Sequence, residues 1–361
     1  MKPRVLFVGR SRISLPLDRA LARKWDAVAD ELDIRVIATG RSGEQEDERF
    51  RLVADRELLA FYALLPLLVR EEVRTFDPDV IVTQSPYEAV VVRPVRGRAR
   101  LLLEVHGDWN TAARLYGSPL RAVLDPVSRQ LARAAVRAAD AVRTVGPFTS
   151  RLVTDAGATP AATFTTYSDV SAFTSTPPRP LPEQPSALFV GVLERYKNVA
   201  GVADAWRRAA PQVPDARLRL VGDGRETDVV SRLVSDVPGR TEWTRRLTPE
   251  EIAQALDAAT VLLLPSFSEG LPRVAMEAFA RGRPVIGARA GGIPDIVEDG
   301  VNGLLVDPHD PGSIAAALVR VLSDRVLAEH LAAGAAASAE QWLQPPEVYA
   351  RRMRELVEGL L

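Results

Sequence analysis

Cysteine is absent from this chain of 361 residues, so no disulfide framework supports a secreted protein. A large excess of one charge is also lacking: the formal net charge is −1, which gives no sign of a nucleic-acid binder. A signal-peptide pattern is missing as well, because the first residues lead directly into an apolar segment that begins at Val5. Together these absences favour a cytoplasmic protein.

Lysine is nearly absent, since the chain contains only Lys2, Lys24 and Lys197. The other basic residues are arginines, and with the abundant Ala, Val and Pro they are typical of a G+C-rich genome. Clusters of arginine therefore say little by themselves. Lys197, by contrast, stands out.

Long hydrophobic runs are few, and the most apolar one is Leu58–Val69. It falls well short of the ~20 residues that a helix needs to cross a bilayer. It is either a core helix that covers a sheet or a surface that touches a membrane, and its length favours the core.

A later helical stretch, residues 120–137, places three arginines on one face. That face is either solvated or a basic patch for an anionic membrane or lipid-phosphate acceptor. The arginines are Arg129, Arg133 and Arg137.

Clusters of metal-binding side chains are also lacking. Asp77 and Asp79 have the spacing of a D-x-D metal motif, but they precede the strand predicted at Val80–Thr83. Ligands of a parallel sheet sit beyond the opposite, carboxyl ends of its strands, so we interpret this segment as a turn. No other acidic or histidine cluster has metal-ligand spacing. We therefore expect a mechanism without a metal ion or another cofactor.

The pattern from Val261 to Val306 is the most informative part of the sequence. Val261–Leu264, residues 284–287 and Gly303–Val306 are short apolar runs with the length of buried strands. A helix is predicted from about Pro272 to Gly282, and a further helix after a Gly-Gly-Ile-Pro loop. Alternating strands and helices at these spacings indicate an α/β fold with a doubly wound parallel sheet. Ligands would sit beyond the strand ends, where Glu269 and Gly291 lie.

Two features of the first predicted helix suggest a binding site. Leu271, in the expected capping position before Pro272, has no side-chain oxygen, so the first helical N–H groups stay open to an anion. Glu277 lies in an otherwise apolar helix, where a carboxylate is costly unless something binds it. Glu269 precedes the helix, so both carboxylates can face one crevice. The alternative is that Glu277 pairs with a nearby arginine and Glu269 is solvated.

The segments SEGLPRVAMEAFARGRPVI and GGIPDIVEDGVNGLLV resemble the E-x7-E signature of retaining glycosyltransferases of family 4, which have the GT-B fold. The resemblance implies two Rossmann-like domains that face a central cleft holding a nucleotide-sugar. It implies that Glu269 contacts hydroxyls of the transferred sugar and that Glu277 contacts the ribose. The adjoining residues from the helix start would bind the donor. They are Gly270, Leu271, Pro272 and Arg273.

A second candidate segment follows the strand predicted at Ser186–Val190. A lysine in a loop between a strand and a helix is suited to hold a phosphate, and Lys197 lies in such a loop after Gly191. The resembled family has G-R-L-x-x-x-K-G here, with Arg and Lys on the donor diphosphate. Lys197 matches the pattern, whereas Val192 stands where the Arg is expected. Arg195 and Arg273 are candidates to replace that charge.

The first half offers two weaker candidates. His106 follows the strand predicted at residues 101–105. A lone histidine is usually structural, but its position at a strand exit and the resemblance, which implies contact with the donor sugar, favour a functional role. Gly9 follows the strand predicted at Val5–Val8, in a turn that is not a G-x-G-x-x-G fingerprint. It either lets a ligand approach, as the resemblance implies for the donor phosphates, or is an ordinary turn glycine.

The chain is too long for one hydrophobic core, so two domains are expected. We predict an acceptor-side domain at residues 1–176, a proline-rich linker at 177–185 and a nucleotide-sugar domain at 186–344. The resemblance implies that a last helix, within 346–361, crosses back to the first domain.

The predicted function is that of a retaining, hexosyltransferase-type enzyme. It would move a sugar from a nucleotide diphosphate to a hydroxyl of a glycan, lipid-linked or small-molecule acceptor. The resemblance implies that the reaction takes place on the front face and without a protein nucleophile. Weak peripheral membrane contact through the first domain, at the inner face of the membrane, is compatible with this. Two alternatives stay open: a nucleotide-sugar epimerase or phosphorylase of the same fold, and a catalytically impaired scaffold or glycan-binding subunit, prompted by Val192.

Overall fold

The computed structural model describes residues 1–41, 47–54, 58–110 and 125–361. The described chain divides into two compact units. The first consists of residues 1–110, 125–168 and 344–361, and the second of residues 169–343. The change of unit therefore falls a few residues before the boundary predicted at 176.

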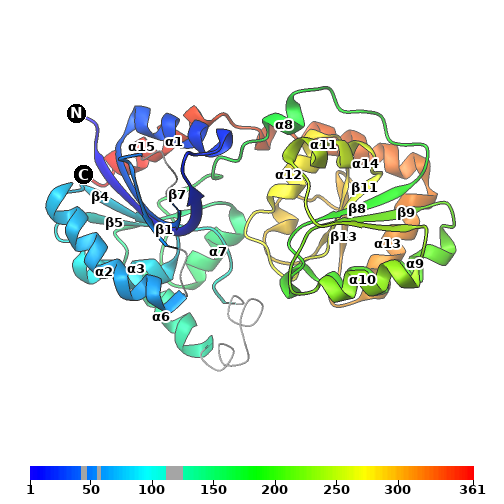
Figure 1. Ribbon diagram of the computed structural model, residues 1–361, viewed down its shortest axis with the longest axis horizontal. Helices are drawn as coiled ribbons and strands as arrows, with labels where there is room; N and C mark the ends of the chain where they lie inside the picture. Colours follow the sequence, from blue (N-terminus) through cyan, green and yellow to red (C-terminus); the bar gives the residue numbers. More distant parts are fainter. Residues whose placement is uncertain (42–46, 55–57, 111–124) are drawn as a thin grey trace. The chain divides into compact units, whose positions relative to one another are not determined.

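The first unit is built on a seven-stranded parallel sheet with the order β3-β2-β1-β4-β5-β6-β7 (Figure 1). The strands are β1 (Arg4–Ser14), β2 (Asp33–Arg41), β3 (Phe50–Val53), β4 (Val80–Thr83), β5 (Arg100–Val105), β6 (Ala141–Thr144) and β7 (Ala162–Thr163). The helices are α1 (Arg19–Glu31), α2 (Leu58–Thr75), α3 (Pro86–Val92), α6 (Asp125–Ala138), α7 (Pro147–Asp155) and α15 (Pro346–Glu358).

Helix α2 uses its apolar run in the core. Phe61, Leu65 and Val69 recur every four residues and are buried against the sheet together with residues of α3 and α6. Leu67, on another side of the helix, is exposed. This confirms the core interpretation of the run. Within the described ranges, no helix combines the length and the apolarity needed to cross a bilayer.

Strand β1 differs from the prediction. It does not end at Val8 but continues to Ser14, with a shift of register against β2 between Val8 and Arg12. Burial of Ile13 explains the continuation, because this side chain extends the apolar face beyond the irregularity. Gly9 therefore lies within a strand rather than in a turn, which corrects the prediction.

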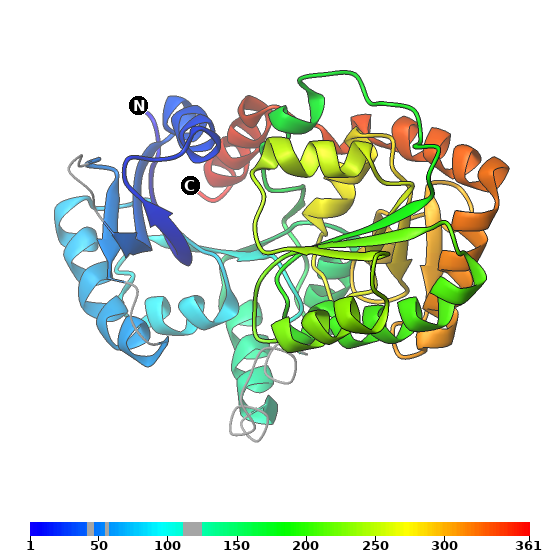
Figure 2. The ribbon, with the colours of Figure 1, turned by 45° about the vertical axis from the view of Figure 1, so that its right-hand side comes forward.

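The second unit contains a six-stranded parallel sheet with the order β10-β9-β8-β11-β12-β13. Helices α9, α10 and α13 cover one face, and α11 and α12 lie on the other (Figures 1 and 2). The strands are β8 (Ser186–Val190), β9 (Arg217–Val221), β10 (Thr241–Thr244), β11 (Val261–Leu264), β12 (Val285–Ala288) and β13 (Gly303–Val306). The helices are α8 (Ser171–Thr174), α9 (Val199–Ala209), α10 (Thr227–Asp236), α11 (Pro249–Asp257), α12 (Arg273–Ala280), α13 (Pro311–Ser323) and α14 (Arg325–Ser338).

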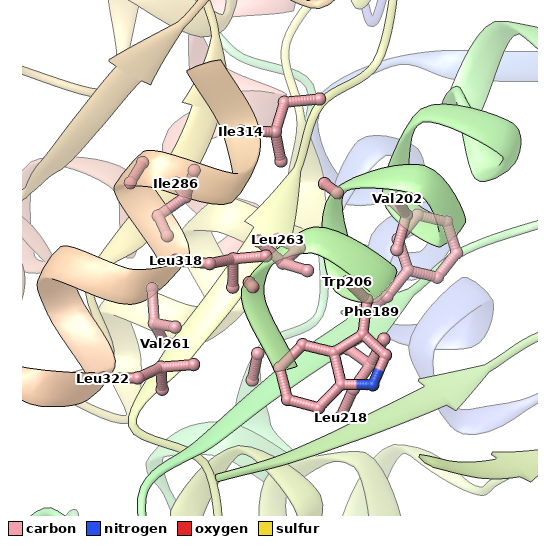
Figure 3. Close-up of a cluster of buried hydrophobic side chains, with 14 of the residues drawn as sticks. Phe189, Val202, Trp206, Leu218, Val261, Leu263, Ile286, Ile314, Leu318 and Leu322 are labelled. Atoms are coloured by element: carbon pink, nitrogen blue, oxygen red, sulfur yellow. The ribbon is translucent and has the colours of Figure 1, made fainter. Parts of the chain in front are cut away.

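The core under α9 is organised around Trp206. Its indole is fully buried among Phe189 and Leu218 of the sheet and other apolar side chains of the second unit (Figure 3). Its Nε1–H donates to the hydroxyl of Thr241 at 3.0 Å, so the buried polar atom is satisfied. This packing holds α9, and therefore the loop that precedes it, against the sheet.

Two local predictions in the second unit were wrong. The Gly-Gly-Ile-Pro loop does not open a helix but ends in one 3-10 turn, Ile293–Asp295. The amide of Glu298 bonds the side chain of Asn302 at 2.8 Å, so the chain turns toward β13 instead of continuing helically. Helix α12 begins at Arg273, and Pro272, with extended ψ of 102°, is the capping residue in place of Leu271.

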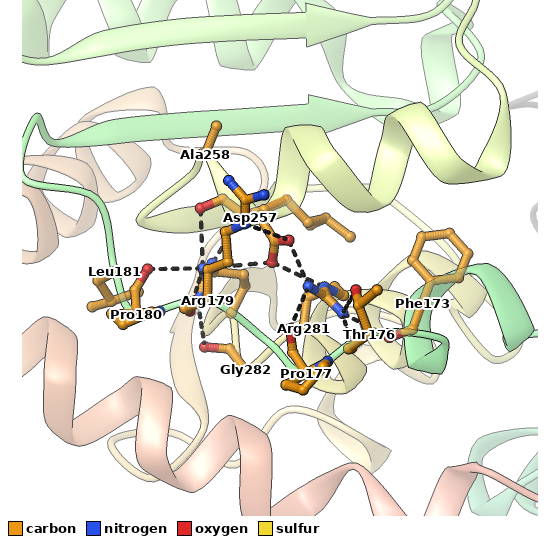
Figure 4. Close-up of polar contacts among 12 residues, drawn as sticks. Phe173, Thr176, Pro177, Arg179, Pro180, Leu181, Asp257, Ala258, Arg281 and Gly282 are labelled. Atoms are coloured by element: carbon orange, nitrogen blue, oxygen red, sulfur yellow. Dashed lines mark hydrogen bonds and ion pairs between the residues drawn. The ribbon is translucent and has the colours of Figure 1, made fainter.

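The proline-rich segment is held by two buried arginines of the second unit (Figure 4). Arg281 donates to the carbonyl of Thr176 at 2.7 Å, and Arg283 donates to that of Arg179 at 2.7 Å. Asp257 accepts from Arg281 Nε at 2.9 Å and balances part of the charge. Together with burial of Phe173, these bonds make the segment part of the second unit, which explains the position of the boundary.

Candidate functional site

Three loops of the second unit meet at the carboxyl edge of its sheet, where parallel α/β sheets bind ligands. The loop after β8 contacts the loop after β11 through the Phe267 amide, which donates to the Tyr196 carbonyl at 2.8 Å. Asn198 connects the same loops because its side chain donates to the carbonyls of Pro265, at 3.2 Å, and Pro308, at 2.7 Å. The three strand exits therefore form one framework.

Asn198 also sets the position of Lys197. It adopts a left-handed conformation, with φ of 57°, and its side chain caps α9 by accepting from the Gly201 amide at 3.2 Å. Gly191 lies beside the Lys197 side chain, since a Cβ at Gly191 would be 3.4 Å from Lys197 Cε. The lysine thus lies over the end of β8.

Lys197 and Glu269 form an ion pair, with 2.6 Å between Nζ and Oε1. Their side chains are 12% and 15% exposed, so the pair is shielded from water but still reachable. At intermediate dielectric such a pair is stronger than a surface salt bridge, yet it can exchange partners with a charged ligand. Glu269 is therefore not solvated, contrary to one part of the alternative interpretation.

Glu277 lies nearby on α12 and is buried. Burial raises the pKa of its carboxyl, while the positive charges of Arg273 and Lys197 act in the opposite direction. Arg273 Nε is 3.0 Å from Glu277 Oε1, so the arginine pairing considered in the sequence is present. Lys197, Glu269, Arg273 and Glu277 form one cluster, which we call the carboxyl-edge cluster.

The start of α12 lies beside this cluster with no side-chain cap at Pro272, which leaves amides of its first turn open. The Gly291-Gly292 loop packs against the preceding backbone of Glu269 and Gly270. A Cβ at Gly292 would lie 1.9 Å from the Gly270 carbonyl oxygen, and Gly291 has a φ of 58°. Glycine is required at both positions, so the loop fixes the backbone of Glu269.

Of the two arginines that could replace the charge expected at Val192, only Arg273 is bonded to a carboxylate of the cluster. Arg195 is exposed, and its side chain has no ion pair among the residues that the structure describes. Val192 is 47% exposed and brings no polar group. Within the described part of the chain, no group of three or more metal-ligating side chains was found.

His106 belongs to the first unit, at the end of β5. Its side chain is 35% exposed, and its Nε2 lies 3.2 Å from Glu104 Oε2. Gly9 is close to Gln84, because a Cβ there would be 2.1 Å from the Gln84 side-chain oxygen. The close approach at Gly9 in this structure is thus made by a side chain of the protein.

Two buried polar features of the structure were not predicted from the sequence. Ser266, after β11, has a buried hydroxyl with no partner among the described residues. Glu104 and Arg143 form a buried ion pair in the first unit, across neighbouring strands in which they are register partners. The sequence signal for this pair was a single charged residue in each of two buried strands, within LLLEV and AVRT.

Comparison with known proteins agrees with this architecture. Residues 19–166 match the family model described as Glycosyltransferase Family 4, and residues 184–324 match Glycosyl transferases group 1. A D-inositol 3-phosphate glycosyltransferase of Nocardioides sp. is 36% identical over 204 residues, covering 50% of this chain and 44% of the relative. The sulfoquinovosyl transferase of Arabidopsis thaliana is 32% identical over 164 residues, covering 45% and 31%. The chain thus spans less than half the length of these curated relatives.

Solved structures share the whole fold. Sucrose-phosphate synthase from Thermosynechococcus elongatus superimposes with a TM-score of 0.80 at 20% identity, covering 99% of both chains. HepE of Anabaena, solved with UDP-glucose, has a TM-score of 0.71 at 20% identity over 99% of this chain and all of that one. The two parallel-sheet units are those of the GT-B glycosyltransferases. Within that class, the chain combines a Glycosyltransferase Family 4 domain with a Glycosyl transferases group 1 domain.

Proposed function

We propose that the protein is a retaining glycosyltransferase that moves a sugar from a nucleotide diphosphate to an acceptor hydroxyl. The observation that carries this proposal is the Lys197–Glu269 pair at the carboxyl edge, beside Glu277 and the uncapped start of α12. One cation and open helical amides suit a diphosphate, and carboxylates suit sugar hydroxyls. That HepE of Anabaena was solved with UDP-glucose supports a nucleotide-sugar donor.

Donor binding would exchange the partners within the carboxyl-edge cluster. The diphosphate takes Lys197 and the open amides that follow Pro272 at the start of α12. Glu269 is then released to accept hydrogen bonds from the transferred sugar. Glu277 binds the ribose, in exchange for its bond with Arg273, and His106 of the first unit binds the sugar.

The same contacts would serve the reaction. As the glycosidic bond breaks, negative charge grows on the leaving phosphate, and Lys197 stabilises it more in the transition state than in the bound donor. The leaving phosphate takes the proton of the acceptor hydroxyl. This hydroxyl attacks on the same face of the sugar, so the anomeric configuration is retained.

We expect turnover to be unchanged when EDTA removes divalent metal ions. Loss of turnover on chelation that Mg²⁺ restores would contradict this part of the proposal.

A thermal-shift panel of UDP-, GDP-, ADP- and TDP-sugars tests the proposal, since a ligand that binds only the folded state raises Tm. We expect one donor class to raise the Tm of the wild type, and Lys197→Ala to reduce the shift. Lys2→Ala, which removes an exposed lysine of the first unit, is the matched control. No shift with any nucleotide-sugar would contradict the proposal.

A second candidate function, a catalytically impaired binding subunit, is favoured by one observation: Val192 is exposed where the family has an arginine. Slow hydrolysis of the bound donor separates the two, because water can replace the acceptor in a working transferase. Binding without release of the nucleoside diphosphate would support the binding subunit.

The acceptor that we propose is a hydroxyl of a glycan, of a lipid-linked saccharide or of a small molecule. We propose at most weak membrane contact, through the first unit.

A further inference from the structure

A buried charge network lies behind His106 in the first unit. Glu104 of β5 and Arg143 of β6 are 2% and 0% exposed, and Arg143 Nη1 donates to Glu104. Arg143 Nη2 also donates to the carbonyl of Phe164 at 2.8 Å. The guanidinium lies over the rings of Phe164, at 4.1 Å, and of Tyr349 from α15, at 5.2 Å. Arg143 is therefore fixed by its backbone and aromatic contacts.

Such a pair is not explained by stability alone. Replacing a buried ion pair by apolar residues is often neutral or stabilising, because the desolvation of two charges offsets their attraction. Burial by itself would raise the pKa of Glu104, but Arg143, His106 and Lys24 outweigh it and lower the pKa to about 2. Glu104 is therefore ionised at any working pH and acts only as a hydrogen-bond acceptor.

Each ring nitrogen of His106 lies near a hydrogen-bonding side chain of the first unit. Nε2 lies 3.2 Å from Glu104 Oε2, and a carboxylate accepts, so Nε2 must carry a hydrogen. Nδ1 of the neutral ring is then an acceptor. It faces the Thr166 hydroxyl at 3.4 Å, a long contact that a ligand hydroxyl could replace. Thr166 itself accepts from Arg143 Nη2 at 3.2 Å, so the network touches both sides of the ring.

We propose that Glu104 is a positioning residue that holds His106 in its Nε2–H tautomer, so that the ring offers Nδ1 as an acceptor to a hydroxyl of the sugar. Arg143 keeps the carboxylate in place, and Tyr349 closes the network from the C-terminal helix. The sugar contact rests on the proposed function, whereas the tautomer does not.

Nitrogen-15 NMR of labelled protein tests the tautomer directly, at a pH where the imidazole is neutral. The chain has three histidines, so a His106→Asn spectrum assigns the signals. The wild type should show a protonated Nε2 and an unprotonated Nδ1. In Glu104→Gln, Arg143 should hold the amide oxygen and turn the NH₂ group toward Nε2, which reverses the tautomer. A wild-type ring protonated at Nδ1, or the same tautomer in both proteins, would overturn the proposal.

Glu72→Gln is the matched control, because Glu72 is another buried carboxylate of the first unit paired with arginines, Arg35 and Arg51. It should leave the His106 signals unchanged. For turnover, Glu104→Gln should lower kcat by about tenfold to a hundredfold, as loss of an orienting partner of a functional histidine does, and Glu104→Asp should recover part of it. A reversed tautomer with unchanged kcat would overturn the positioning role. If the wild type transfers no sugar but shows the expected tautomer, the proposed function fails and the assignment of the tautomer stands.

Discussion

The two units bury their carboxylates in different ways. In the second unit, Glu269 and its partner Lys197 are 15% and 12% exposed at the edge of the sheet. In the first, Glu104 and Arg143 are 2% and 0% exposed and lie within the sheet. A pair that remains reachable can exchange its partner for a ligand, whereas a fully buried pair cannot without a large desolvation cost. The difference separates a pair suited to bind a substrate from one suited to hold a neighbouring side chain.

The largest expected effect is that of Lys197→Ala. Loss of one preorganised contact to a charge that develops in the transition state costs ~10²–10³ in kcat, and nucleotide affinity should fall far less. Val192→Arg in the same background should recover part of the loss if the two positions share a geometry. Initial rates of nucleoside diphosphate release measure both variants. A Lys197→Ala enzyme within a few-fold of wild type would point to Arg273 or Arg195 instead.

Glu269→Gln tests whether the accessible pair exchanges its partner. Without the carboxylate, kcat should fall by roughly tenfold to a hundredfold, because a charged hydrogen bond to the sugar is lost. The affinity for the nucleoside diphosphate alone should rise by about fivefold, since about 1 kcal/mol of internal pairing no longer competes for Lys197. Calorimetric titration measures the second effect, with Glu329→Gln, in an exposed pair of α14, as control. A fall in diphosphate affinity would contradict the exchange.

Glu277→Gln should act mainly on donor binding. A ribose contact is made equally in the bound donor and in the transition state, so its loss raises KM rather than lowering kcat. We expect a rise in the donor KM of about fivefold to tenfold. Steady-state kinetics with the donor varied measure this split. A selective collapse of kcat with donor affinity intact would reject the ribose role.

The smallest expected effect is that of replacing Glu88, another buried carboxylate of the first unit, which we compare with Glu104. It is buried like Glu104 but is bonded to Tyr62, at 3.1 Å, and to Ser85 instead of an arginine. Burial raises its pKa to about 7. A raised folded-state pKa gives stability that is present below pH 4.5 and is lost as the pH rises through 7.

We therefore expect Glu88→Gln to raise Tm relative to the wild type at pH 8.5, by a few degrees at most, and to have little effect at pH 4.5. Tm measured by calorimetry at the two pH values checks this. An equal effect at both pH values would show that the carboxyl does not titrate in this range.

The sequence predicted the second unit better than the first, for a physical reason. Strands β8, β11 and β13 begin and end where their apolar runs do, and Glu269 and Glu277 are close along the chain in a dense motif. The cation that pairs with Glu269 is distant in sequence, so the Lys197 contact required the fold.

The first unit depends on contacts between distant segments. Glu104 and Arg143 meet because β5 and β6 are neighbours in register, and Tyr349 arrives from the last helix. The path of β1 through Gly9 was also missed, since pairing with β2, and not local turn propensity, decides where that strand ends. Local patterns could not predict any of these pairings.

The most direct test of the central claim is an NMR time course of the wild-type protein with the nucleotide-sugar that the thermal-shift panel selects. The spectra follow the release of the nucleoside diphosphate, with Lys197→Ala as the control. They also record the anomeric proton of the sugar product before mutarotation changes its configuration. We predict that the diphosphate is released, that the first product has the anomeric configuration of the donor, and that the variant is slower by about a hundredfold or more. A first product of inverted configuration, or no release of diphosphate beyond that of the variant, would contradict it.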